Sequence, residues 1–147
     1  MKILIVIVLY KFKLEDVVPL KSLQFQLSKY RDRIGFYIYD NSPYPDNECI
    51  GKDMLFDCPL KYTSDKSNPG LSKPYNEACN YAEDNKFDWL LLLDQDTSLP
   101  TNFLDVYFSE AENERGYNMF APKVKVDGLG YISPCLFLHK RGRFMKE

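Results

Sequence analysis

The sequence predicts an α/β domain in which a mostly parallel sheet has helices on both faces. Two segments of strand length, the continuous Ile/Leu/Val run Ile3–Leu9 and the strongly hydrophobic run Phe87–Leu93, are typical of central strands that are covered on both sides. Between them, strand-like segments alternate with segments whose apolar residues recur every three or four positions, as in amphipathic helices. Sheets of this kind bind ligands at the C-terminal ends of their strands, so the polar residues that follow each strand are the candidate site.

Length and composition indicate one ordinary globular domain. The chain has 147 residues, of which 45% are hydrophobic and 27% are charged. Its formal net charge of −2 gives no basic field, so we expect a small ligand and no nucleic acid. The first apolar run lacks a small-residue cleavage site and is too short to span a bilayer. We therefore expect a cytoplasmic protein without a transmembrane segment.

The first half of the sequence predicts a βαβ unit. Ile3–Leu9 is its first strand and Ile34–Tyr39 its second, which ends at turn-forming residues that begin with Asp40. A helix is predicted between them, with Pro19 in its first turn. Its apolar residues are Val17, Leu20, Leu23, Leu27 and Tyr30. The segment Pro43–Pro59 is typical of a loop with one short strand inside, and Leu60–Thr63 is a further strand.

The second half continues the alternation. A polar turn, Asp65–Gly70, precedes a helix that begins near Ser72, and Phe87–Leu93 is predicted to be a central strand. Another helix is expected over 100–113, with Gly116 as its stop. The apolar faces of these two helices are predicted to hold Tyr75, Ala78, Cys79 and Ala82 in the first, and Phe103, Leu104, Tyr107, Phe108 and Ala111 in the second. Met119–Val126 and Leu136–Leu138 are strand-like.

The four cysteines, Cys49, Cys58, Cys79 and Cys135, form no Cys-x-x-Cys pair. This spacing favours neither a zinc site nor a disulfide framework. We expect them to be reduced and to fill space.

An acidic pair follows the strand Phe87–Leu93. In an extended segment residues i and i+2 point the same way, so Asp94 and Asp96 can present two carboxylates to one hard cation while Gln95 points elsewhere. Mg²⁺ or Mn²⁺ held by few protein oxygens keeps positions that phosphate oxygens of a ligand can fill. An Asp-x-Asp pair alone is a weak signal. The joint placement of Tyr10, Asp40, the segment 68–72 and this pair at successive strand ends strengthens it.

The succession IVLY, IYDNS, NPGLSKPYNEA and WLLLLDQDTSLP resembles the nucleotide-binding half of family-two glycosyltransferases of the GT-A fold, particularly the rhamnosyltransferase-like bacterial members. The resemblance implies a Rossmann-like fold for a nucleotide-sugar-binding domain over 1–126. The segment 127–147 would then be a tail or the start of an acceptor-side half, in a chain truncated at its C-terminus.

The resemblance also implies roles for residues that bind the donor. Leu9 and Tyr10 stand where the family contacts the nucleotide, and Asp40 matches the acidic residue that hydrogen-bonds the donor base. A family pattern of Asn, Gly and Asn at the helix beneath the donor is matched by Asn68, Gly70 and Asn76.

The metal motif of the family is matched as well. Asp94 and Asp96 correspond to the DxD motif that holds a divalent cation, Mn²⁺ or Mg²⁺, and the diphosphate. Lys11 departs from the family, which usually carries Asn or another small polar residue there. It is expected to contact a phosphate or to lie on the surface.

The implied activity is transfer of a sugar from a nucleotide-diphosphate sugar to a hydroxyl of a saccharide or lipid-linked saccharide, in bacterial surface polysaccharide synthesis. Relatives supply the carboxylate base after the metal motif, so the catalytic base stays unassigned here. His139, the only histidine, is a weak candidate beside its default place in an exposed basic tail with Lys140, Arg141 and Arg143. Such a tail could also touch anionic lipid at the inner face of the membrane.

The isolated chain is therefore expected to bind the donor and to transfer sugar poorly. The apolar segment Tyr131–Leu138 has little sequence after it to cover it, so we expect it to be partly exposed, poorly ordered or buried in a homodimer.

Two other classes remain open. A phosphotransferase with a nucleophilic aspartate also has paired aspartates after a strand. That pair usually follows the first strand, with a Thr two positions after the second Asp, whereas Thr97 follows immediately here. The stronger alternative is a nucleotide-binding or interaction module without catalysis.

Overall fold

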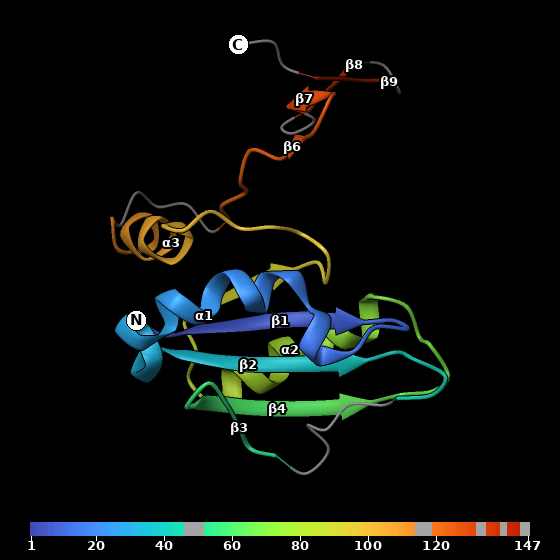
Figure 1. Cartoon of the computed structure of the whole chain (residues 1–147), viewed down its shortest axis with the longest axis vertical. Coiled ribbons are helices and arrows are strands. Elements are labelled where there is room, and N and C mark those ends of the chain that lie inside the picture. The colour runs from blue at the N-terminus through green and yellow to red at the C-terminus, as the bar shows by residue number, and fades with distance from the viewer. Residues whose placement is uncertain (46–51, 114–118, 132–134, 139–140, 145–147) are drawn as a thin grey trace. The chain divides into compact units, whose positions relative to one another are not determined.

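The structure is a computed structural model that describes residues 1–45, 52–113, 119–131, 135–138 and 141–144 (Figure 1). The chain divides into two compact units, Met1–Glu112 and Asn113–Glu147. This division lies earlier in the chain than the boundary at residue 126 that the sequence suggested. The first unit contains the α/β architecture.

The first unit is built on a five-stranded sheet with the order β3-β4-β2-β1-β5. Its strands are β1 (Ile3–Leu9), β2 (Ile34–Asp40), β3 (Met54–Leu55), β4 (Cys58–Ser64) and β5 (Trp89–Leu93). All neighbouring pairs are parallel except β3 and β4, and the arrows of β1, β2 and β4 run the same way in Figure 1. The mostly parallel sheet is therefore confirmed.

The prediction that Phe87–Leu93 forms a central strand is wrong within the described residues. There β5 pairs only with β1 and ends the sheet, so β1, β2 and β4 are the strands that have a neighbouring strand on each side. Leu91 and Leu93 are buried, but Leu92, on the other face, is 47% exposed. A continuous apolar run indicates that a strand packs against other elements, and it does not report how many strands flank it.

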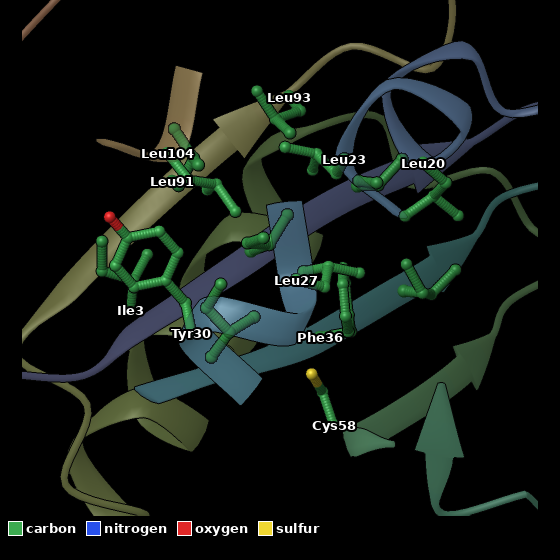
Figure 2. Close-up of a cluster of buried hydrophobic side chains, with 14 of the residues drawn as sticks. Ile3, Leu20, Leu23, Leu27, Tyr30, Phe36, Cys58, Leu91, Leu93 and Leu104 are labelled. Atoms are coloured by element: carbon green, nitrogen blue, oxygen red, sulfur yellow. The ribbon is translucent and has the colours of Figure 1, made fainter. Parts of the chain in front are cut away.

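Helices cover both faces of the sheet, as predicted. On one face, α1 (Val18–Tyr30) and α3 (Phe103–Glu112) bury their apolar residues against β1, β2 and β5 (Figure 2). On the other face, Ala78 and Ala82 of α2 (Ser72–Asp84) pack with Leu4 and Val6 of β1. Short 3₁₀ helices, η1 (Leu14–Asp16) and η2 (Arg31–Arg33), precede and follow α1.

The apolar stripes of the helices differ from prediction at one residue. The stripe of α1 is confirmed, because Leu20, Leu23 and Leu27 are buried after Pro19 at the first turn. In α2 the buried positions are four residues apart and exclude Cys79, which is exposed. One step along a helix turns a side chain by about 100°, and this step carries Cys79 out of the contact with the sheet. Cys58 fills core space as expected.

The second unit contains two antiparallel strand pairs. They are β6 (Lys125–Val126) with β7 (Gly130–Tyr131), and β8 (Cys135–Leu138) with β9 (Arg141–Phe144). Of the predicted strand Met119–Val126 only the last two residues are strand; Pro122, which has no N–H to donate, stands in the segment before them. Leu136–Leu138 is confirmed as strand, and Arg141 and Arg143 belong to β9 rather than to a tail.

Some predicted features lie outside the described residues, among them Gly116, His139, Lys140 and Cys49. None of the helices that the structure describes is long and apolar enough to cross a membrane.

Candidate functional site

The carboxyl ends of four parallel strands lie along one edge of the sheet. In the strand registers, Leu9 is paired with Asp40, and Asp40 with Ser64, while β5 ends beside Ile7 of β1. The segments that begin with Tyr10, Asp65 and Asp94 therefore leave the sheet at the same edge as Asp40. The sequence placed its candidate residues at strand ends, and the parallel pairing brings those strand ends together.

Asp40 is a buried structural residue in this conformation. Its side chain has no exposed surface. One carboxylate oxygen accepts a hydrogen bond from the Ser42 N–H at 2.8 Å, and the other accepts one from the Tyr62 hydroxyl, also at 2.8 Å. These bonds fix the turn after β2. The direct contact with a donor base that the resemblance implied would require this arrangement to open.

Asn41, predicted only as a turn residue, joins three segments of the edge. Its N–H donates to the carbonyl of Leu9 at 2.8 Å, and its Nδ2 donates to the carbonyl of Gly70 at 2.9 Å. The side chain is buried, and its Oδ1 has no hydrogen-bond partner among the residues that the structure describes. Buried amide oxygens are nearly always paired, so this acceptor lacks a partner that the described residues do not supply.

The turn before α2 is shaped by its own side chains. Asp65 accepts hydrogen bonds from the N–H and Oγ of Ser67 and from the ammonium of Lys73 at 2.7 Å. These donors hold the pKa of Asp65 well below its usual range, Lys73 having the largest effect. Asn68 and Gly70 both have positive φ, 48° and 76°, in the left-handed region that Gly and Asn adopt more readily than other residues.

The three residues assigned to the donor-binding helix are all exposed. Asn68 and Gly70 lie in the turn, and Asn76 lies in the second turn of α2. Gly70 contacts the rest of the edge through its carbonyl and Asn41. A donor-binding role for Asn68 and Asn76 is supported by the motif pattern of the sequence.

Tyr75, at the start of α2, was predicted only as part of an apolar face. It is half-buried and packs at the margin of the core on the α2 side of the sheet. Burial raises the pKa of its hydroxyl, and the negative charge of Asp94 raises this pKa further. The phenol therefore lies within electrostatic reach of the acidic pair, a position that helical periodicity alone does not reveal.

Asp94 and Asp96 are exposed directly after β5. The side chain of Gln95 contacts the end of β1: its Oε1 accepts from the Tyr10 N–H at 2.9 Å, and its Nε2 donates to the Tyr10 carbonyl at 3.4 Å. The backbone turns at Gln95 and Asp96 instead of continuing as a strand, so strand alternation does not explain the direction of these side chains.

A cation at the acidic pair would find few protein ligands. Within the described residues, no group of three or more His, Cys, Asp or Glu side chains could hold a metal ion. A cation at Asp94 and Asp96 would therefore take most of its ligands from water or from a bound anion. This is the usual state of Mg²⁺ at phosphate-binding sites, and it disfavours Zn²⁺, which prefers nitrogen and sulfur ligands.

An open pocket of about 450 Å³ lies beside the ends of β1 and β2. It is lined by Lys11, Phe12, Lys13, Ser42, Pro43 and Tyr44. The two sides are joined by the Lys11 N–H, which donates to Ser42 Oγ at 2.8 Å. Lys11 has a φ of 53°, and its ammonium lies 5.1 Å from the centre of the Tyr10 ring. The lining thus includes two lysines and two aromatic residues, and the ammonium of Lys13 also lies 3.9 Å from a carboxylate oxygen of Glu15.

Comparison of the chain with protein-family models, with curated proteins and with solved structures found no match. Function is therefore inferred from the chemistry of the strand-end edge and from the motif pattern along the sequence.

Proposed function

We propose that the chain binds the nucleoside diphosphate part of a nucleotide sugar at the carboxyl edge of its sheet and serves as the donor site of a glycosyltransferase. One observation carries the proposal. An exposed acidic pair and a pocket with two lysines follow neighbouring strands of one sheet, and Tyr10, next to Lys11, is hydrogen-bonded to the residue between the two aspartates. A nucleoside diphosphate with its cation needs both kinds of group.

In this proposal the pocket takes the nucleoside. Tyr44 is 87% exposed and offers a ring face on which a base can stack. Lys11 supplies positive charge toward the phosphates, whereas the charge of Lys13 is partly offset by Glu15, whose carboxylate lies 3.9 Å from its ammonium. Asp40 acts indirectly, by fixing the turn that carries Ser42. Oδ1 of Asn41, which is buried and has no partner among the described residues, would accept from the ligand only after the turn opens to expose it.

Asp94 and Asp96 would hold Mn²⁺ or Mg²⁺ against the diphosphate. When bound, the cation supplies positive charge that offsets the charge of the nucleoside diphosphate as it leaves the sugar. The sugar acceptor, a saccharide or lipid-linked saccharide, and the base that deprotonates it are not assigned to residues. The proposal therefore covers donor binding and leaving-group stabilisation.

Titration calorimetry with UDP, dTDP and GDP, each with and without Mn²⁺, tests the proposal. We expect at least one diphosphate to bind, with a Kd at least tenfold lower in Mn²⁺. Asp96→Ala should abolish the Mn²⁺ effect, whereas Asp84→Ala, at an exposed residue at the far end of α2, should leave it unchanged. If none of the diphosphates binds in Mn²⁺, the proposal is wrong.

Release of sugar from nucleotide sugars separates an enzyme from a binding module. Mn²⁺-dependent hydrolysis or transfer would support the glycosyltransferase. Diphosphate binding with neither reaction would favour the alternative of a nucleotide-binding module without catalysis.

A further inference from the structure

Gln95 makes contacts that reach well beyond the acidic pair in which it stands. Its side-chain amide faces the backbone of Tyr10, with Oε1 accepting at 2.9 Å and Nε2 donating at 3.4 Å. Its own carbonyl accepts from the N–H of Val18 at 3.0 Å. One residue thus binds the end of β1 and the start of α1.

The side chain of Gln95 takes the place of a backbone partner. The parallel pairing of β1 with β5 ends at Ile7 and Leu93, whereas β1 continues to Leu9. Beyond Leu93 the chain turns, so its peptide groups no longer face β1. A primary amide has the same donor and acceptor as a peptide group, and Gln95 uses both to extend the contact between the segments to Tyr10.

Tyr10 directly precedes Lys11, which lines the pocket beside β1 and β2, here called the nucleotide pocket. The next residue, Lys11, is held from the other side by Ser42 through the 2.8 Å bond to its N–H. The backbone of Tyr10 and Lys11 is therefore held between Gln95 and Ser42. Movement of the acidic pair relative to the pocket would have to break the Gln95 bonds first.

The hydrogen bond from the Val18 N–H to the Gln95 carbonyl attaches the same segment to α1. Val18 is the first residue of α1, whose cap residue Val17 makes no side-chain capping bond. The first N–H groups of a helix have no partner within it, and Gln95 supplies one. Because α1 is packed on the sheet through its buried leucines, the segment is attached to a rigid element.

We propose that Gln95 is a positioning residue that fixes Asp94 and Asp96 relative to the nucleotide pocket and thereby couples cation binding to nucleotide binding. The inference rests on the proposed donor site. Replacement of residues that orient metal ligands typically weakens metal binding about 10- to 100-fold. Coupling between two ligands is reciprocal, so Gln95 should strengthen UDP binding in Mn²⁺ more than in its absence.

The test uses Gln95→Met, which keeps the length of the side chain and removes both amide bonds. Mn²⁺ affinity is measured by electron paramagnetic resonance of the free ion, and UDP affinity by calorimetry with and without Mn²⁺. We expect Mn²⁺ affinity to fall about tenfold or more. The improvement of UDP binding by Mn²⁺ should shrink, and amide hydrogen exchange at Tyr10 should speed up.

Gln26 provides a matched control. Its Oε1 accepts from the Leu104 N–H at 2.9 Å and its Nε2 donates to the Pro100 carbonyl at 3.2 Å, so it makes a similar two-sided contact away from the acidic pair. Gln26→Met should cost stability and leave Mn²⁺ affinity unchanged. Gln95→Asn, whose amide is too short to reach both Tyr10 atoms, replaces the methionine variant if that variant does not fold.

The outcomes separate the two proposals. If wild type binds Mn²⁺ and the Gln95 variant binds it with equal affinity, the positioning role is overturned and the proposed donor site is not affected. An equal loss in the Gln26 variant also overturns it, since the effect would then be one of general stability. Absence of Mn²⁺ binding in wild type overturns both proposals.

Discussion

Gly35 of β2 has no side chain because a ring occupies the space that one would need. A Cβ at this position would come within 2.5 Å of Cζ and 2.9 Å of Cε1 of Phe87. Phe87 is partly buried, stacks on Tyr81 and packs against the core on the α2 face, and these contacts oppose its displacement. The Phe87 ring on the α2 face of the sheet thus explains why β2 carries a glycine at position 35.

Gly35→Ala should therefore lower the free energy of unfolding by about 1–3 kcal/mol, the usual cost of overpacking a core. Urea denaturation followed by circular dichroism measures it. Phe87→Leu in the same chain should recover part of the loss, because the shorter side chain leaves room for the methyl group. Equal stability of Gly35→Ala and wild type would contradict the packing account.

Single residues show where sequence reasoning stops. The sequence identified Asp40 and the acidic pair through their place after strands, and the structure sets them along one edge. The sequence did not show that both oxygens of the Asp40 carboxylate accept hydrogen bonds, from Ser42 and Tyr62, because Tyr62 comes from another strand, β4. Asn41 and Gln95 were missed as links for the same reason: their partners are distant in the sequence.

At the scale of elements, the entrance to α2 depends on one ionised side chain. Asp65 is bonded to Ser67 and Lys73, which lower its pKa far below the usual value. A carboxyl whose pKa is lower in the folded state stabilises that state above its unfolded pKa of about 4, and the contribution is lost as the pH falls further. Asp65 should thus stabilise the turn at neutral pH.

Asp65→Asn should be less stable than wild type at pH 7, and the difference should narrow as the pH is lowered below about 4. Urea unfolding at pH 7, 5 and 3 gives the comparison. Lys73→Gln removes the ammonium that pairs with Asp65, and its stability difference from wild type should narrow over the same pH range. A difference that stays constant from pH 7 to pH 3 would show that ionisation of Asp65 is not what holds the turn.

Strand β5 shows how a correct element can be given the wrong neighbours. Its five residues are all apolar, and this predicted a central strand. Leu91 is 6% exposed beneath α1 and α3, yet Leu92 is 47% exposed on the other face. Order of strands in a sheet depends on connections that run through several elements, and local periodicity carries no information about them.

The contrast between these two leucines can be measured. Leu91→Ala should lower the free energy of unfolding by about 2–5 kcal/mol, as for a buried leucine. Leu92→Ala should lower it by less than about 1 kcal/mol. Chemical denaturation of both variants at the same pH gives the comparison, and equal large losses would mean that Leu92 is covered in solution.

At the scale of the whole molecule, the core and the candidate site are kept apart. Two apolar layers, one on each face of the sheet, hold unit Met1–Glu112 together, whereas the polar groups gather at the strand ends. Alternation of strands and helices made the layers predictable from sequence. The pocket beside β1 and β2 was not predictable, because it is formed by residues from two loops and includes Lys11 in a left-handed conformation.

The central claim, that a divalent cation and a nucleoside diphosphate meet at the carboxyl edge of the sheet, is tested most directly by paramagnetic broadening of amide NMR signals. Mn²⁺ is added in substoichiometric amounts to the labelled protein in the presence of UDP. We predict the strongest broadening at Tyr10, Gly70 and Asp96, and little at Lys2, Lys86 and Asp88, which lie at or near the opposite edge. Broadening centred on Asp88, or none at the edge that carries Asp96, would contradict the account.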